Sequence, residues 1–141
     1  MTLEDLDRTL PNGLHDAKIR TMTHNFERAI VRLEADILVG LPDDPPEDRY
    51  RYRAGEILFH RVLFCTVEMP ENERILGHSG SIWFKFWRME PGLLAEKVAK
   101  RLSPETLCYS LYILEWESQI QIACEDVNFA WLEENKADLP K

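Results

Sequence analysis

Two neighbouring residues near the start of the chain, His15 and Asp16, are of types that could do chemistry. An imidazole beside a carboxylate can act as a general base or as a metal ligand. Adjacent residues of a strand, however, point to opposite faces, so these two side chains would not cooperate in an extended segment. We therefore expect Asp16 to cap a turn after Asn12-Gly13 and His15 to hydrogen-bond locally, and we keep the pair as a candidate polar site.

The chain lacks the local motifs of the common enzyme classes. Its other histidines, His24, His60 and His78, have no histidine at the i+2 or i+4 spacing that favours a metal pair. The sequence contains no G-x-S-x-G elbow, no phosphate-binding loop and no dinucleotide fingerprint. We therefore expect no catalytic residue, no metal and no cofactor, and we favour a binding role over an enzymatic one.

The segment 81–89 is the most aromatic part of the chain. In an extended conformation Trp83, Lys85 and Trp87 share one face, and Phe84 and Phe86 share the other. Such a strand either is buried on both sides or presents one face to a ligand or partner. We favour burial on both sides, because core strands are rich in aromatic residues, and we keep Trp83, Lys85 and Trp87 as candidate binding residues.

The run 49–53 alternates arginine with Tyr50 and Tyr52. Tyrosines and arginines together can bind single-stranded nucleic acid, but the net charge of −8 opposes that function. We favour an edge strand with solubilising arginines, and we keep Tyr50 and Tyr52 as candidate binding residues. The acidic loop 43–48 could attract a cation or a basic partner, but it lacks the spacing of a calcium loop, so we expect a solvated loop.

Length and composition predict one globular domain over residues 1–141. Hydrophobic residues make up 45% of the chain, enough for a packed core, and the pI of about 5.0 means that the overall field repels nucleic acid and anionic membranes. The same field favours a basic protein partner.

The cysteines and the N-terminal sequence bear on location. The chain has an odd number of cysteines, and none of them has C-x-x-C spacing: Cys65, Cys108 and Cys124. We therefore expect buried free thiols and a reducing compartment. The first residues are acidic and show no apolar run of the signal-peptide kind, and no run of about 18 apolar residues occurs anywhere. These features predict a cytoplasmic protein without a membrane span.

The hydrophobic pattern predicts an α+β fold that is mainly antiparallel β. We expect about seven strands in a curved sheet or sandwich, with one helix at about 92–102 covering an opening. Gly55 is expected to mark a bulge, and the apolar run 57–69 is expected to bend near His60-Arg61. Residues 1–10, with at most one helical turn, and residues 133–141 are expected to be peripheral or flexible. The strand segments expected are 14–23, 29–39, 49–53, 57–69, 81–89, 107–116, 119–125 and 127–131.

The stretch Pro11-Asn12-Gly13-Leu14-His15-Asp16-Ala17 resembles the opening of a loose group of small bacterial proteins in which such a segment precedes β-hairpins. Some similar domains are regarded as immunity proteins that block toxins. The resemblance covers these seven residues and carries over no functional residue. It implies a bacterial origin and a binding role.

Three hypotheses for the function follow. The first is a non-catalytic protein-binding module, immunity-like, with an acidic surface and a basic partner. The second is a small-molecule binder or minor enzyme with a cavity inside the curved sheet, lined by aromatic residues of the segments 81–89 and 107–116: Trp83, Trp87, Tyr109, Tyr112 or Trp116. The third is a structural protein that forms a homodimer through an aromatic face.

Overall fold

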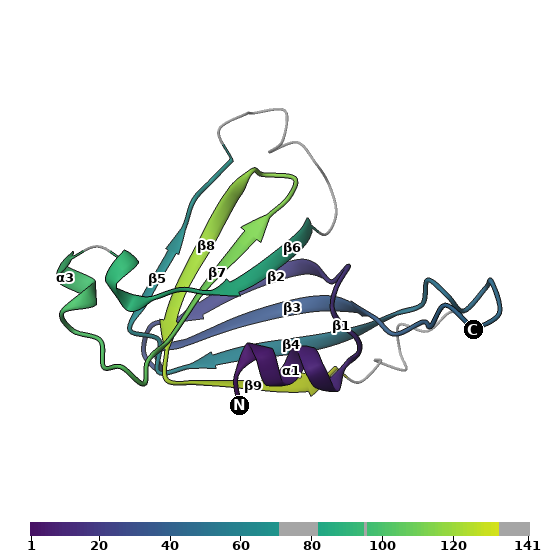
Figure 1. Cartoon of the computed structure of the whole chain (residues 1–141), viewed down its shortest axis with the longest axis horizontal. Helices are drawn as coiled ribbons and strands as arrows, with labels where there is room; N and C mark the ends of the chain where they lie inside the picture. The colour runs from purple at the N-terminus through teal and green to yellow at the C-terminus, as the bar shows by residue number, and fades with distance from the viewer. Residues whose placement is uncertain (71–81, 95, 133–141) are drawn as a thin grey trace.

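The computed structural model describes residues 1–70, 82–94 and 96–132, and within them the chain forms an antiparallel sheet with a short helix against it (Figure 1). The sheet has eight strands in the order β5-β8-β7-β6-β2-β3-β4-β9, and each neighbouring pair is antiparallel. The α+β, mainly antiparallel fold is therefore confirmed. The strands are β1 (Pro11–Leu14), β2 (Lys18–Asn25), β3 (Ile30–Leu38), β4 (Tyr52–His60), β5 (Phe64–Val67), β6 (Ile82–Arg88), β7 (Leu107–Ile113), β8 (Ser118–Cys124) and β9 (Asp126–Trp131).

The sheet consists of two halves that meet at one short ladder. Strands β2, β3, β4 and β9 form one half, and β6, β7, β8 and β5 form the other, which rises away from the first in Figure 1. Within the described residues two pairs, Lys18↔Trp83 and Ile19↔Ile82, join β2 to β6. The sheet is therefore strongly curved, with an inner and an outer face.

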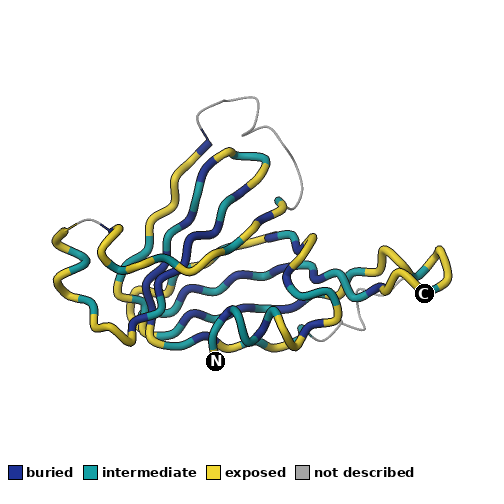
Figure 2. Tube along the Cα trace, viewed as in Figure 1, coloured by how far each residue is buried: buried dark blue, intermediate teal, exposed yellow. Residues whose placement is uncertain are grey.

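The core lies on the inner face. On β3, Val31, Leu33, Ala35 and Ile37 are at most 1% exposed, while the residues that alternate with them are half-buried. This alternation, visible as dark blue and teal along β3 in Figure 2, confirms the strand predicted at 29–39. Fully buried residues of the other half, such as Tyr109 and Ile122, belong to the same cluster, so one core spans both halves of the sheet.

The helix α1 (Leu3–Thr9) packs against this inner face. A capping box starts it: Thr2 accepts a hydrogen bond from the Asp5 N–H, and the Asp5 carboxylate accepts one from the Thr2 N–H. Leu3 and Leu6 are 0% and 1% exposed. The expectation that residues 1–10 are peripheral is therefore wrong, because the curved sheet leaves an apolar inner face that these leucines cover.

A polar cluster fastens α1 to the second half of the sheet. The buried Tyr109 hydroxyl accepts a hydrogen bond from the Leu3 N–H at 3.1 Å, donates one to Glu4 at 2.8 Å and lies 3.0 Å from the Arg88 guanidinium. Burial and the Glu4 bond raise the pKa of Tyr109 to about 12. Burial alone would raise the pKa of Glu4, but the hydrogen bond from Tyr109 and the charge of Arg88 bring it below its usual value.

The segment 91–102 is less helical than predicted. It contains a 3-10 turn, η1 (Pro91–Leu93), and the short helix α3 (Glu96–Ala99). Pro91 and Gly92 open a turn that ends at Leu93, and the apolar residues of the segment have only a small patch to cover, around Cys108 and Ala123 on the outer face. The only helix of seven residues in the described part of the chain is α1, which covers the inner face instead.

Three local predictions have different outcomes. The bend near His60-Arg61 is confirmed, because β4 ends at His60 and Arg61 has a φ of 51°. The bulge at Gly55 is wrong: the register through Gly55 is continuous, and a Cβ there would lie 2.6 Å from the Phe129 ring. Glycine at this position makes room for that ring. The predicted tail 133–141 lies outside the described residues.

The run 49–53 is not an edge strand. Only Tyr52 and Arg53 enter β4, which lies between β3 and β9, while residues 49–51 belong to a loop that projects from the sheet. Among the described residues, no helix has the length and apolar character needed to cross a membrane.

Candidate functional site

The outer face of β6 carries an exposed aromatic group. Trp83 and Trp87 are 43% and 46% exposed, and Lys85 between them is also exposed, whereas Phe84 on the inner face is 4% exposed. The favoured expectation of burial on both faces is therefore wrong, because the outer face is open to solvent. The reason is that α1 covers the inner face, while the 91–102 segment covers only the outer face around Cys108.

A tyrosine from the next strand completes this group. Tyr112 of β7 pairs with Lys85, and its ring stacks on Trp87 with centroids 6.4 Å apart and an interplanar angle of 29°. We call Trp83, Lys85, Trp87 and Tyr112 the outer aromatic surface. Sequence reasoning placed Tyr112 beside Tyr109 in a cavity, although residues three apart on a strand lie on opposite faces.

The Lys18 ammonium extends the surface toward β4. It lies 5.3 Å from the centre of the Trp83 ring and 4.9 Å from the centre of the Tyr52 ring. Both distances are within the range of cation–π attraction. Burial raises the pKa of Tyr52, as do the nearby carboxylates of Asp16 and Asp36, so its hydroxyl stays protonated. Tyr52 is thus connected to Trp83 through one cation.

Three carboxylates stand at the rim of the outer aromatic surface. Both carboxylate oxygens of Glu115 accept a hydrogen bond from the backbone N–H of Trp83, at 3.1 and 3.0 Å. Glu68 lies 3.3 Å from the N–H of Gln119, the β8 partner of Tyr112. Asp16 lines a small cleft together with Trp83 and Lys85. The surface therefore has an aromatic centre with two lysines, Lys85 and Lys18, and carboxylates at its rim.

His15 and Asp16 do contact each other, contrary to the argument from strand geometry. They lie in a turn between β1 and β2, where Asp16 has a φ of 61°, and the left-handed backbone brings its carboxylate 2.8 Å from His15 Nδ1. The two residues line a cleft of ≈ 340 Å³ with Trp83, Lys85 and neighbouring residues. The His15 side chain is 80% exposed.

Tyr50 does not join the site. It is 79% exposed in the loop that follows β3, whereas Tyr52 lies in β4 against Lys18. The structure therefore brings together six of the seven residues singled out from the sequence: His15, Asp16, Tyr52, Trp83, Lys85 and Trp87.

The aromatic residues expected around an interior cavity do not share one face of the sheet. Tyr109 is fully buried in the core, while Trp83, Trp87 and Tyr112 are on the outer face. A hollow that sequence reasoning missed lies at one end of the sheet, where a cleft of ≈ 1070 Å³ is lined in part by Arg53.

Reactive groups are few in the described residues. Within them no cluster of three or more histidine, cysteine or acidic side chains could hold a metal ion. The three cysteines are free, and burial raises the pKa of Cys65, Cys108 and Cys124, that of Cys124 to about 12. These thiols are therefore protonated at neutral pH and poor nucleophiles.

No protein-family model, no curated protein and no solved structure matches this chain.

Proposed function

We propose that this protein is a non-catalytic binding module that docks a protein with a basic surface on the outer aromatic surface. The observation that carries the proposal is the pair Trp83 and Trp87, which are 43% and 46% exposed on a regular strand. Exposed tryptophans add little to the stability of the monomer, whereas tryptophan and tyrosine dominate the binding energy of protein interfaces.

The arrangement around the tryptophans resembles the anatomy of an interface. Protein interfaces combine an aromatic centre with a polar rim that excludes water when the partner is bound. Here the centre consists of Trp83, Trp87 and Tyr112, and the rim contains Glu115 and Asp16. A rigid sheet holds the centre in place, so little side-chain freedom is lost on binding.

Charge favours a basic partner. Carboxylates place negative charge at the rim of the outer aromatic surface, and the chain as a whole has a net charge of −8. A negative field accelerates the approach of a positively charged protein and opposes nucleic acid. The resemblance of residues 11–17 to immunity-like proteins agrees with this role, which we place in the cytoplasm because the three cysteines are free thiols.

The proposal is tested by capture from a lysate of the source cells with the tagged full-length protein and two variants. Trp83→Ala combined with Trp87→Ala removes the centre of the surface. Phe26→Ala removes an aromatic residue that is 83% exposed in the turn between β2 and β3, outside the surface, and is the matched control.

We expect quantitative mass spectrometry to find a basic protein that is retained by the wild type and by Phe26→Ala and lost from the double variant. Equal recovery of every captured protein by all three baits would contradict the proposal. Analytical sedimentation of the free protein tests the homodimer hypothesis. A dimer in the wild type that is lost in the double variant would assign the surface to self-association instead.

A further inference from the structure

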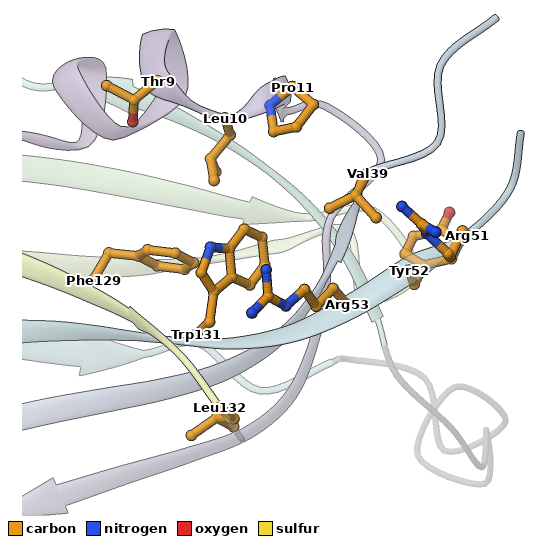
Figure 3. A pocket seen from close by; sticks show the side chains of 10 residues that line it. All are labelled: Thr9, Leu10, Pro11, Val39, Arg51, Tyr52, Arg53, Phe129, Trp131 and Leu132. Atoms are coloured by element: carbon orange, nitrogen blue, oxygen red, sulfur yellow. The ribbon is translucent and has the colours of Figure 1, made fainter. Parts of the chain in front are cut away.

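A second candidate binding site lies at the end of the sheet where α1 and β1 meet β4 and β9 (Figure 3). The cleft has a volume of ≈ 1070 Å³, at the upper end of the range of about 300–1,000 Å³ that is typical of small-molecule sites. In Figure 3, Thr9, Leu10 and Pro11 lie across the cleft from Phe129 and Trp131. The walls therefore combine apolar side chains with polar and charged ones.

The cleft is basic, in contrast to the acidic molecule around it. Among the described residues that line it, Arg51 and Arg53 are the charged ones and none is acidic. In the part of the chain that the structure describes, neither arginine forms an ion pair. Five other arginines pair with carboxylates there, namely Arg8, Arg20, Arg32, Arg61 and Arg88.

An aromatic support holds one of these two guanidinium groups in place. The centre of the Arg53 guanidinium lies 4.4 Å from the centre of the Trp131 ring, and Trp131 meets Phe129 edge-on with centroids 4.9 Å apart. Gly55, which pairs with Trp131, leaves room for the Phe129 ring. Stacking leaves the edge of a guanidinium free to bind a carboxylate through two hydrogen bonds.

We propose that this cleft binds a small organic anion, with a carboxylate on Arg51 and Arg53 and an aromatic body against Phe129, Trp131 and Leu10. Two cations that form no ion pair with any described residue account for the anionic group, and the apolar part of the walls accounts for the aromatic body. The net charge of −8 repels a polyanion at long range, which favours a small ligand over nucleic acid. This site is separate from the outer aromatic surface and does not depend on the function proposed for that surface.

The test uses 2-naphthoate as the probe, with 2-naphthamide as its uncharged counterpart and inorganic phosphate as an anion without an aromatic body. Binding to the ¹⁵N-labelled full-length protein is followed by the indole N–H signal of Trp131. Arg51→Gln combined with Arg53→Gln removes both cations. Arg28→Gln is the control for loss of charge, because Arg28 is exposed in the turn between β2 and β3.

We expect 2-naphthoate to shift the Trp131 signal saturably and to bind at least about tenfold more tightly than the amide, as charge-assisted hydrogen bonds to two guanidinium groups require. The double arginine variant should lose at least about tenfold in affinity, and Arg28→Gln should stay within about twofold. Phosphate should bind more weakly than 2-naphthoate.

Three results would overturn the proposal. The first is equal affinity for 2-naphthoate and 2-naphthamide. The second is an equal loss of affinity for 2-naphthoate in the double arginine variant and in Arg28→Gln. The third is the lack of a saturable shift of the Trp131 signal. Phosphate that binds as tightly as 2-naphthoate would overturn the role of the aromatic walls. Trp83→Ala with Trp87→Ala should leave the affinity for 2-naphthoate unchanged, so failure here is distinct from failure of the protein-binding function.

Discussion

The inner face of β6 places Phe84 and Phe86 against the core, whereas its outer face leaves Trp83 and Trp87 partly in solvent. Both faces are aromatic, and the difference lies in what covers them. On the inner side the sheet curves around α1, whose leucines are buried in the same cluster. On the outer side, apolar residues of the segment 91–102 pack around Cys108. Aromatic content on both faces of a strand therefore does not establish burial.

The comparison predicts that the two faces contribute unequally to stability. Phe84→Ala should lower the free energy of unfolding by about 3–5 kcal/mol, because it leaves a cavity in the packed core. Trp83→Ala should lower it by less than about 1 kcal/mol, because that side chain is 43% exposed. Urea unfolding of both variants measures the difference, and equal losses would show that the outer face is part of the folding core.

Gly55→Ala should be the next largest effect. A Cβ at this position would lie 2.6 Å from the Phe129 ring, so the ring or the strand must move. We expect a loss of about 1–3 kcal/mol, as overpacking usually costs, together with weaker binding of 2-naphthoate, because Phe129 lines the cleft. Chemical denaturation and the Trp131 signal provide the two readouts. An unchanged stability would mean that the ring has free space.

Tyr109→Phe tests how α1 is fastened over the inner face. The change removes the hydroxyl that accepts from the Leu3 N–H and leaves that donor unpaired in a buried site. The expected loss is about 1–3 kcal/mol. Amide hydrogen exchange should rise first in residues 3–9, while the outer aromatic surface should keep its partner. Uniform exchange across the chain would contradict a local role for this hydroxyl.

The smallest expected effect is a pH dependence that originates in α1. The folded-state pKa values of Glu4 and Asp5 lie below the usual 4.5 and 3.8: burial works against the shift at Glu4, where Tyr109 and Arg88 outweigh it, and hydrogen bonds from Thr2 act at Asp5. A lowered pKa means that the stabilisation is complete above the unfolded-state value and is lost as the pH falls through the folded-state value.

We therefore expect stability to fall with acidification below about pH 4.5, and Glu4→Gln to make that fall shallower. Thermal unfolding between pH 3 and pH 7 measures both slopes, with pH values chosen to span the range in which carboxylates titrate, about 3 to 5. Identical slopes in the variant and the wild type would show that Glu4 does not contribute to the pH dependence of stability.

Much of the fold could be predicted because the alternation of apolar and polar residues with a period of two indicates a half-buried strand. The segment 29–39 shows it clearly and forms β3, and the apolar run 57–69 was too long for one strand and does bend at Arg61. The helix expected at about 92–102 did not form as one element, because its apolar residues Leu94, Val98 and Leu102 cover only a small patch and short turns are sufficient.

The sequence pattern singled out several residues of the candidate site by type, but it did not indicate Lys18 or Glu115, and it did not give the geometry. Trp83 and Trp87 were singled out by type, but their exposure depends on long-range packing that a local pattern does not contain. The contact between His15 and Asp16 depends on the left-handed backbone at Asp16, and adjacent residues in a strand would not make it. The basic cleft joins Arg53 to Trp131, from strands distant in sequence.

The most direct measurement of the central claim is site-specific cross-linking in the source cells. A photoreactive amino acid replaces Trp87 on the outer aromatic surface in one protein and Phe26, the exposed control in the turn between β2 and β3, in another. We expect position 87 to yield one dominant cross-link to a basic protein and position 26 to yield none to that protein. Cross-links to the same proteins from both positions, or none from position 87, would contradict a partner-binding role for this surface.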